Sequence, residues 1–335
     1  MSPAPIPPEP RPLPPPVLVM TCGDPAGIGP EIAAKLAGDD GPPFVWIGDP
    51  AHLPPGTRWQ EVAAPADATA VPAGQMPVLR HDFPAPARPG RPDPANAPAV
   101  ISVIERAVAL VKNGAAAGLV TCPINKQALV EGAGFAYPGH TEFLAHLAGG
   151  CDVAMMLACP ELRVVPATIH IPLSAVPQTL DRGRLAAAIR LTHAALLHDF
   201  GLPAPRIAVA GLNPHAGEGG TMGTEEATLI APVLDDLRAE GLDLRGPLPA
   251  DTMFHTEARA RYDAAICMYH DQALIPIKTI DFAGGVNVTL GLPFVRTSPD
   301  HGTAHDIAGR GIADPTSLRA ALRMAAEMAA RRTTA

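Results

Sequence analysis

The sequence predicts an α/β protein with two domains, and three observations lead to this expectation. Short apolar runs alternate with segments of helical period along most of the 335 residues, which is typical of a parallel sheet covered by helices. A middle region differs in its sequence pattern. Two β-rich runs flank Pro160-Glu161 and predict an antiparallel hairpin. The composition, 47% hydrophobic and 17% charged, is that of a globular chain. We therefore expect two domains with a cleft between them, where small ligands bind.

Local signals justify the elements that precede the hairpin. Pro30 and Glu31 open a helix, because proline suits the first turn and glutamate faces the positive end of the helix dipole. Apolar residues at helical spacing begin at Val100, and Gly114 stands where a helix would end. The predicted order is strand 17–20, a helix from 30, strand 44–47, loops with short strands over 50–98, a helix from about 100, strand 117–121 and a helix near 125.

Helical and apolar segments alternate again after the hairpin. The predicted order is a helix over about 181–199, strand 206–212, a helix over 224–240, strand 263–269 and an alanine-rich closing helix over 314–332. The 16 residues at the N-terminus contain nine prolines and no apolar core of a signal peptide. This segment is interpreted as a disordered or polyproline tail.

The charge, the cysteine content and the apolar runs argue against a nucleic-acid-binding protein and against a membrane-spanning one. The net charge is −8 and no lysine- or arginine-rich run is present, so the electrostatic footprint of a nucleic-acid-binding protein is missing. The five cysteines are odd in number and none has CxxC spacing, which favours reduced thiols and a cytoplasmic location. No uninterrupted apolar run is long enough to span a membrane.

Three histidines lie where apolar runs end: His170, His215 and His270. The carboxyl ends of strands in an α/β sheet converge on one crevice, and three neutral imidazoles with open positions suit a catalytic ion such as Zn²⁺. The alternative is that each histidine is an ordinary hydrogen-bonding residue. Asp271 and Asp251 accompany them, either as general base, as partners that orient an imidazole, or as turn and cap residues.

Anion-binding signals occur in three other places. "GDPAGIGPE" is neither a Rossmann GxGxxG nor a Walker A loop, but it brings backbone N–H groups to the start of a helix. His140 and Thr141 follow a Pro-Gly turn at another helix start, where Thr141 is alternatively a cap. Further on, three polar residues are either a clamp for phosphate or carboxylate or solvated surface residues. They are Lys278, Asn287 and Arg296.

Six motifs follow one another in order along residues 17–330. They are "GDPAGIGPEI", "GHTEFLA", "GLNPHAGEGGTMGTEE", "GPLPADTMF", "MYHDQ" and "GVNVTLGLPFVRTSPDHGTAHDIAGRG". Together they resemble the 4-hydroxythreonine-4-phosphate dehydrogenase family of the vitamin B6 pathway. "HGTAHDIAGRGIADP" is also similar to the adenine-binding loop of isocitrate and isopropylmalate dehydrogenases, whose fold this family shares and which bind NAD without a Rossmann fingerprint.

The resemblance implies a two-domain isocitrate/isopropylmalate dehydrogenase-like fold with the active-site cleft between the domains. We expect the tail at 1–16, an α/β domain with nucleotide-binding loops at 17–138 plus 285–335, and a second α/β domain with metal ligands and dimer contacts at 139–284. The implied metal ligands are His170, His215 and His270. The implied substrate-binding residues are His140, Thr141, Lys278, Asn287 and Arg296. The implied cofactor contacts are His301, Gly302 and Asp306.

The implied reaction is the NAD- or NADP-dependent oxidation of 4-phosphooxy-L-threonine to 2-amino-3-oxo-4-phosphooxybutanoate, which loses CO₂ to give 3-amino-2-oxopropyl phosphate. The resemblance also implies one divalent ion per site (Zn²⁺, Co²⁺ or Mg²⁺) and a homodimer in which the partner subunit supplies one histidine. The residue types leave Asp251, Asp271 or a metal-bound hydroxide as the base that takes the proton. The nearest alternative is a dehydrogenase of the same fold that acts on 4-phospho-D-threonate or 4-phospho-D-erythronate. A metal-dependent hydrolase and a non-catalytic binding protein are more distant alternatives.

Overall fold

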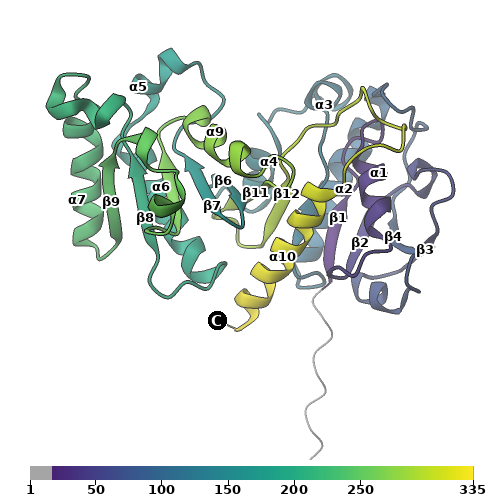
Figure 1. The fold of residues 1–335 in the computed structure, drawn as a ribbon. Coiled ribbons are helices and arrows are strands. Elements are labelled where there is room, and N and C mark those ends of the chain that lie inside the picture. The colour runs from purple at the N-terminus through teal and green to yellow at the C-terminus, as the bar shows by residue number, and fades with distance from the viewer. Residues whose placement is uncertain (1–16, 335) are drawn as a thin grey trace, which may run out of the picture.

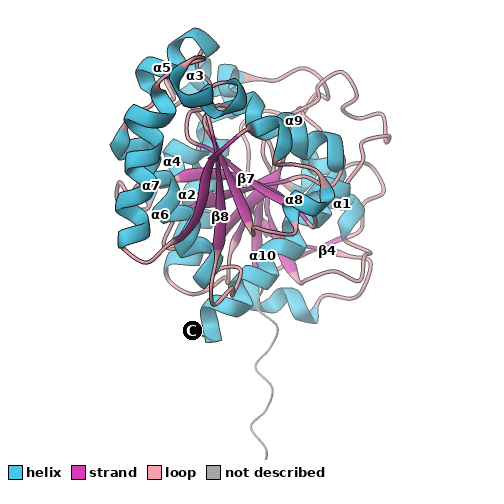
Figure 2. Ribbon diagram, turned by 60° about the vertical axis from the view of Figure 1, so that its left-hand side comes forward, coloured by secondary structure: helices cyan, strands magenta, loops and turns pink. Residues whose placement is uncertain are grey.

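The computed structural model describes residues 17–334 of the chain. The proline-rich tail predicted at 1–16 lies outside the described residues. Within the described residues the strands form one 12-stranded sheet that runs across the whole molecule (Figure 1). Figure 2 shows helices on both faces of this sheet. The predicted α/β class is therefore confirmed.

The strand order divides at the middle of the sheet. The order is β3-β4-β2-β1-β5-β12-β11-β6-β7-β10-β8-β9. The first seven positions hold β1 (Leu18–Thr21), β2 (Phe44–Gly48), β3 (Trp59–Glu61), β4 (Met76–Arg80), β5 (Leu119–Thr121), β11 (Val286–Leu290) and β12 (Arg296–Pro299). The other five hold β6 (Ala154–Cys159), β7 (Leu162–Pro166), β8 (Arg206–Ala210), β9 (Asp243–Leu248) and β10 (Ala264–Cys267). The first group comes from 17–138 plus 285–335 and the second from 139–284, although the two-domain division itself stays a prediction.

Antiparallel pairing is confined to the centre of the sheet. β6 and β7 form the predicted hairpin around Pro160-Glu161, with Leu157 opposite Val164. β11 lies antiparallel to β12 on one side and to β6 on the other. The remaining pairs are parallel, including β1 with β2 and β5, and β10 with β7 and β8. The carboxyl ends of β7, β8 and β10 therefore point to the same edge of the sheet.

Helices cover both faces of the sheet (Figure 2). They are α1 (Gly29–Leu36), α2 (Ala97–Lys112), α3 (Lys126–Ala133), α4 (His140–Leu147), α5 (Val176–Thr179), α6 (Arg182–His198), α7 (Ala231–Ala239), α8 (Thr256–Arg259), α9 (His270–Ile280) and α10 (Thr316–Thr334). Glu31 lies in the first turn of α1 as predicted, and the helix predicted at 224–240 is a π-helical turn (Glu226–Ile230) followed by α7. Sequence reasoning missed α5, α8, α9, β9, β11 and β12.

Among residues 17–334, one helical segment is apolar enough to cross a membrane by length and composition alone. This segment, Pro94–Lys112, contains α2 and has a mean hydropathy of 1.3, and half of its most apolar window is buried. Its buried side chains, which include Val103, Ile104 and Val108, belong to the main hydrophobic core. We therefore assign α2 as a core helix.

Candidate active site

A cavity of about 430 Å³ lies at the carboxyl ends of the central strands. Its walls come from residues that follow β5, β7 and β12, from β11, and from the first residues of α4 and α9. The predicted site residues that line it are His140, Thr141, His170, His270, Asn287, Arg296, His301 and Gly302. Residues that sequence reasoning assigned to separate motifs are thus brought together, as the convergence of strand ends predicts.

Four buried polar atoms in this cavity have no hydrogen-bond partner among the described residues. They are His140 Nε2, Asn287 Oδ1, Arg296 Nε and His301 Nε2. Buried polar groups in folded proteins are nearly always paired, because leaving one unpaired costs about 1–3 kcal/mol. Four such atoms on one cavity are therefore most simply explained by a polar ligand that completes their hydrogen bonds.

Arg296 is the cation at the base of the cavity. Its side chain is 3% exposed, and its guanidinium donates to Thr289 Oγ1 at 2.9 Å and to Thr121 Oγ1 at 2.7 Å. Burial lowers its pKa to about 10, against the opposing effect of the Glu142 carboxylate. The group therefore stays charged at neutral pH, and its free Nε–H is available to an anion.

His140 is held as a neutral imidazole. Burial of the ring, with a contribution from the positive charge of Arg296, lowers its pKa well below the usual value. The residue is partly exposed as a whole, but its Nε2 atom is buried. His140 begins α4, whose N-cap is Gly139, so the alternative interpretation of Thr141 as the cap is wrong and Thr141 lines the cavity instead.

The lowered pKa of His140 predicts a pH-dependent stability. Below the ordinary histidine pKa of about 6.5 the unfolded chain binds a proton that the folded chain does not, so this contribution to stability is present above about pH 6.5 and is lost as the pH falls through it. We expect a His140→Gln variant to lose less thermal stability than the parent between about pH 7.5 and pH 5.5. Equal losses in thermal denaturation of the two proteins would contradict a neutral His140.

Lys278 lies beside the cavity. Its Nζ atom forms an ion pair with Asp300 Oδ2 at 2.7 Å, and it is Asp300 that lines the cavity. The three residues predicted to bind a phosphate or carboxylate therefore do not act together. Asn287 and Arg296 line the cavity, whereas Lys278 neutralises a neighbouring carboxylate. Asp300 and Glu142 were missed by sequence reasoning, although both lie within motifs quoted above and adjoin a predicted site residue.

Two of the three predicted metal ligands lie together. The ring centroids of His170 and His270 are 5.7 Å apart. The Nδ1 atom of His270 contacts Asp271 Oδ1 at 2.7 Å, which leaves Nε2 of His270 for another partner. Among residues 17–334 no group of three or more His, Cys, Asp or Glu side chains is arranged to hold a metal.

His215 occupies a separate and unusual turn. The five residues from His215 to Gly219 all have positive φ angles, a conformation that non-glycine residues seldom adopt. Asn213 secures this turn, because its backbone N–H donates to Glu226 Oε1 at 2.7 Å and its Nδ2 donates to Glu225 Oε2 at 2.8 Å. His215 is exposed and does not line the cavity of this chain.

The two predicted acids differ in their placement. Asp271 contacts His270 and is therefore positioned to orient that imidazole. Asp251 is exposed in the short 3-10 turn Ala250–Thr252 and does not line the cavity. The role of general base stays a prediction for both Asp271 and Asp251.

The predicted cofactor loop packs against the loop that opens α1. Ile28 N–H donates to the carbonyl of Thr303 at 3.0 Å, and His305 Nε2 contacts Asp24 Oδ2 at 2.8 Å. His301 and Gly302 line the cavity at the beginning of this loop, while Asp306 is exposed further along it. The "GDPAGIGPE" motif and the predicted cofactor loop therefore form one joined unit, through contacts between residues 275 and 281 positions apart that the sequence did not reveal.

Comparison with known proteins identifies the family. The family model described as "Pyridoxal phosphate biosynthetic protein PdxA" matches residues 43–325. A protein from Paracoccus denitrificans (strain Pd 1222), named 4-hydroxythreonine-4-phosphate dehydrogenase, is 68% identical over 94% of this chain and 98% of its own length. A protein of the same name from Roseobacter denitrificans is 62% identical over 94% and 98%.

A solved structure agrees with these sequence matches. The crystal structure of 4-hydroxythreonine-4-phosphate dehydrogenase from Klebsiella pneumoniae superposes with a TM-score of 0.86 at 40% identity. The superposition covers 94% of this chain and 99% of that chain. The resemblance found in the motifs is thereby confirmed, and the chain belongs to the PdxA family of pyridoxal phosphate biosynthetic proteins.

Proposed function

We propose that this protein oxidises the C3 hydroxyl of 4-phosphooxy-L-threonine with NAD or NADP. The product is 2-amino-3-oxo-4-phosphooxybutanoate, a β-keto acid that loses CO₂ to give 3-amino-2-oxopropyl phosphate. The observation that carries the proposal is the set of four unpartnered polar atoms around one cavity beside a buried arginine. Family membership and the shared name of the relatives supply the reaction type.

The substrate is held by residues that match its charged groups. Arg296 offers Nε–H to a phosphate or carboxylate oxygen, and Asn287 and Thr141 add neutral polar contacts. Neutral His140 accepts or donates one hydrogen bond, depending on its tautomer, without adding charge beside Arg296. Lys278 acts through Asp300, whose carboxylate it pairs, so that the cavity wall is not repulsive to an anion.

The cofactor loop contains His301, Gly302 and Asp306, which we assign to contacts with the dinucleotide. His301 fits this role because its buried Nε2 lacks a partner while its Nδ1 contacts the carbonyl of Gly302 at 2.9 Å. A bound nicotinamide supplies the hydride acceptor that no side chain provides. The chain's own contribution is to hold substrate and cofactor side by side in a shared cavity.

A divalent ion is assigned to His170, His270 and His215. The first two fit such a site, because they are neighbouring imidazoles and the Nε2 atom of one is free while Asp271 orients its ring. The third ligand does not come from the same chain in this arrangement, so we propose that His215 is supplied by a second copy. Imidazole ligands suit Zn²⁺ or Co²⁺ better than Mg²⁺, and a bound ion supplies Lewis acidity that lowers the pKa of the hydroxyl.

The proton of the C3 hydroxyl needs an acceptor, and the two carboxylates differ in their fitness for it. Asp271 already contacts Nδ1 of His270, which favours an orienting role. Asp251 is exposed and is placed in the site only if a second copy brings it there. We therefore propose Asp251 as the general base in an assembled dimer.

Exposed apolar side chains on and after α9, and one beside the histidine pair, support the proposed homodimer. Ile275 on α9 is 65% exposed, Phe282 after α9 is 81% exposed, and Leu173 is 66% exposed. Leu173 also lines a hollow of about 270 Å³ together with His170 and His270. Large apolar side chains exposed around a site incomplete in one chain indicate a surface covered by another subunit.

Two further proposals concern the domains and the location of the protein. We propose that the boundary between the two domains lies near residues 138 and 285. We also propose a cytoplasmic location, which the five free thiols support.

An Ile275→Glu substitution is expected to dissociate the homodimer and to reduce turnover at least about tenfold. A charge placed in a buried apolar contact costs several kcal/mol, and the site loses the ligand from the second copy. Light scattering after size exclusion measures the first effect and NADH formation the second. As a control, Trp59→Glu changes an exposed apolar residue (39%) on β3, the strand at the far edge of the sheet. A dimeric Ile275→Glu protein with full activity would refute this interface.

The proposed function is tested by following NADH or NADPH formation with 4-phosphooxy-L-threonine and, in parallel, 4-phospho-D-threonate and 4-phospho-D-erythronate. Each reaction is run with and without a chelator. Turnover on the L-threonine compound that the chelator abolishes supports both the reaction and the metal. Turnover on the D-compounds alone would replace the substrate and retain the dehydrogenase chemistry. A protein that uses none of them would refute the proposal.

A further inference from the structure

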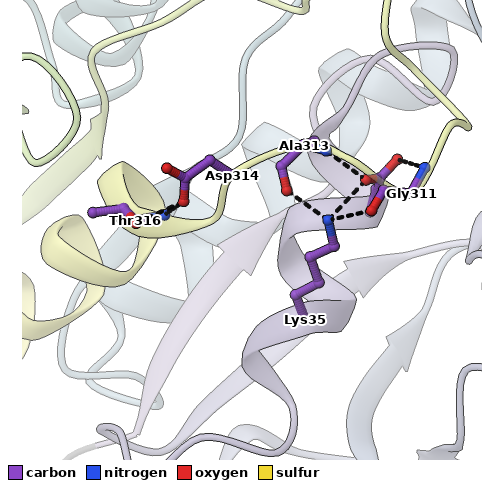
Figure 3. Close-up of polar contacts among 6 residues, drawn as sticks. Lys35, Gly311, Ala313, Asp314 and Thr316 are labelled. Atoms are coloured by element: carbon purple, nitrogen blue, oxygen red, sulfur yellow. Dashed lines mark hydrogen bonds and ion pairs between the residues drawn. The ribbon is translucent and has the colours of Figure 1, made fainter.

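Two side chains of α1 hold the far end of the predicted cofactor loop. Lys35 Nζ donates to the carbonyls of Gly311 and Ala313, and also to Glu31 Oε1 at 3.0 Å (Figure 3). Glu31 in turn accepts from Ala313 N–H at 2.9 Å and from Gly311 N–H at 3.2 Å. The N–H and C=O groups of both loop residues are thus satisfied by one ion pair, which we call the Glu31–Lys35 clamp.

Burial and hydrogen bonds act in opposite directions on the pKa of Glu31 in this clamp. Burial alone would raise the pKa of Glu31, but the hydrogen bonds from Lys35, Ala313 and Gly311 together lower it below its usual value. The Glu31 side chain is 7% exposed and that of Lys35 is 33% exposed, so the pair is only partly screened by solvent. Glu31 therefore stays ionised at neutral pH.

The loop between β12 and α10 is consequently fixed at two points. Near its start, Thr303 and His305 contact the loop that precedes α1. At its end, the clamp fixes Gly311 and Ala313 to α1 itself. The stretch from Asp306 to Arg310 lies between these points, carries exposed residues such as Asp306 and Gly309, and is held internally by short turns.

We propose that Glu31 and Lys35 are positioning residues that keep the 301–313 loop in the conformation that binds the dinucleotide. The inference rests on the proposed function, because it assigns the loop to NAD or NADP. A loop already ordered before binding does not have to be immobilised by the ligand, and affinity rises accordingly. Neither side chain lines the substrate cavity, so the clamp should act on dinucleotide binding and not on substrate binding.

A Lys35→Met substitution tests the clamp, with binding of NADH, NADPH and 4-phosphooxy-L-threonine measured separately. We expect the Kd of the preferred dinucleotide to rise about tenfold and the Kd of the phosphorylated substrate to stay within about twofold. Hydrogen exchange at Gly311 and Ala313 should accelerate. Lys35→Arg retains the charge and several N–H donors, so it should restore most of the dinucleotide affinity even if Lys35→Met folds poorly.

Arg319 provides the matched control. It joins α10 to the segment after α1 through Asp39, with Nε and Oδ2 2.6 Å apart and a similar exposed fraction, but it does not touch Gly311 or Ala313. Arg319→Met should leave both dissociation constants unchanged. An unchanged dinucleotide Kd in Lys35→Met, or an equal rise for the substrate, would overturn the clamp alone. A parent protein that binds neither NADH nor NADPH would overturn the proposed function and this inference together.

Discussion

An Arg296→Met variant is expected to bind 4-phosphooxy-L-threonine at least about 100-fold more weakly than the parent and to lose a similar factor in kcat/KM. Removing one member of a buried charge pair costs about 2–5 kcal/mol, and about 3 kcal/mol corresponds to roughly 100-fold. Arg296 is 3% exposed and lines the cavity, and its buried Nε–H has no hydrogen-bond partner among the described residues. Calorimetric titration with the substrate and initial-rate kinetics measure the two effects.

The same variant should keep its fold when no substrate is bound. Burial lowers the pKa of Arg296, so removal of the buried charge offsets part of the cost of losing its hydrogen bonds to Thr289 and Thr121. Arg163→Met is the matched control, since Arg163 is half-buried and stacks on Phe200 at 4.6 Å outside this cavity. Substrate affinity that is unchanged in Arg296→Met would remove the anion-binding role.

The helices and strands that were predicted correctly are those with a short-range signal in the sequence. The β6–β7 hairpin, β1, β2, α1 and α2 each have a short-range signal, such as a Pro-Glu turn or an apolar stripe, and each is confirmed. α9 was missed because Pro276 lies inside it, and proline in a helix interior normally argues against a helix. β11 and β12 were missed because their register depends on distant partners, as when Arg296 pairs with Leu119, and pairing across such a distance leaves no local trace.

The structure brings part of the predicted site together. Residue type and position singled out His140, Asn287 and Arg296, and these line one cavity. The sequence could not show that Lys278 pairs with Asp300, because that contact depends on where α9 lies relative to the end of β12. Nor could it show that His215 is separated from His170 and His270, since strand ends that share an edge of a sheet need not bring every following loop to one point.

A His215→Ala variant is expected to lose bound divalent metal and to turn over substrate at least about 1000-fold more slowly, while it keeps its fold. Lewis-acid stabilisation of a developing alkoxide is worth several kcal/mol, and about 4 kcal/mol corresponds to roughly 1000-fold in rate. Metal content by mass spectrometry and NADH formation measure the two effects. His215→Asn provides a second version, because asparagine tolerates the positive φ angle of 53° at this position better than alanine does.

His198→Ala is the matched control for this variant, because His198 is an exposed histidine in the last turn of α6 and lies in none of the predicted motifs. It should retain both metal and turnover. Mixing His215→Ala with a His270→Ala variant tests the shared site more sharply. If each chain lends His215 to its partner, a mixed dimer contains one site with all three histidines and regains activity, whereas neither variant does so alone. A His215→Ala protein that is active without metal would show that His215 is not a ligand.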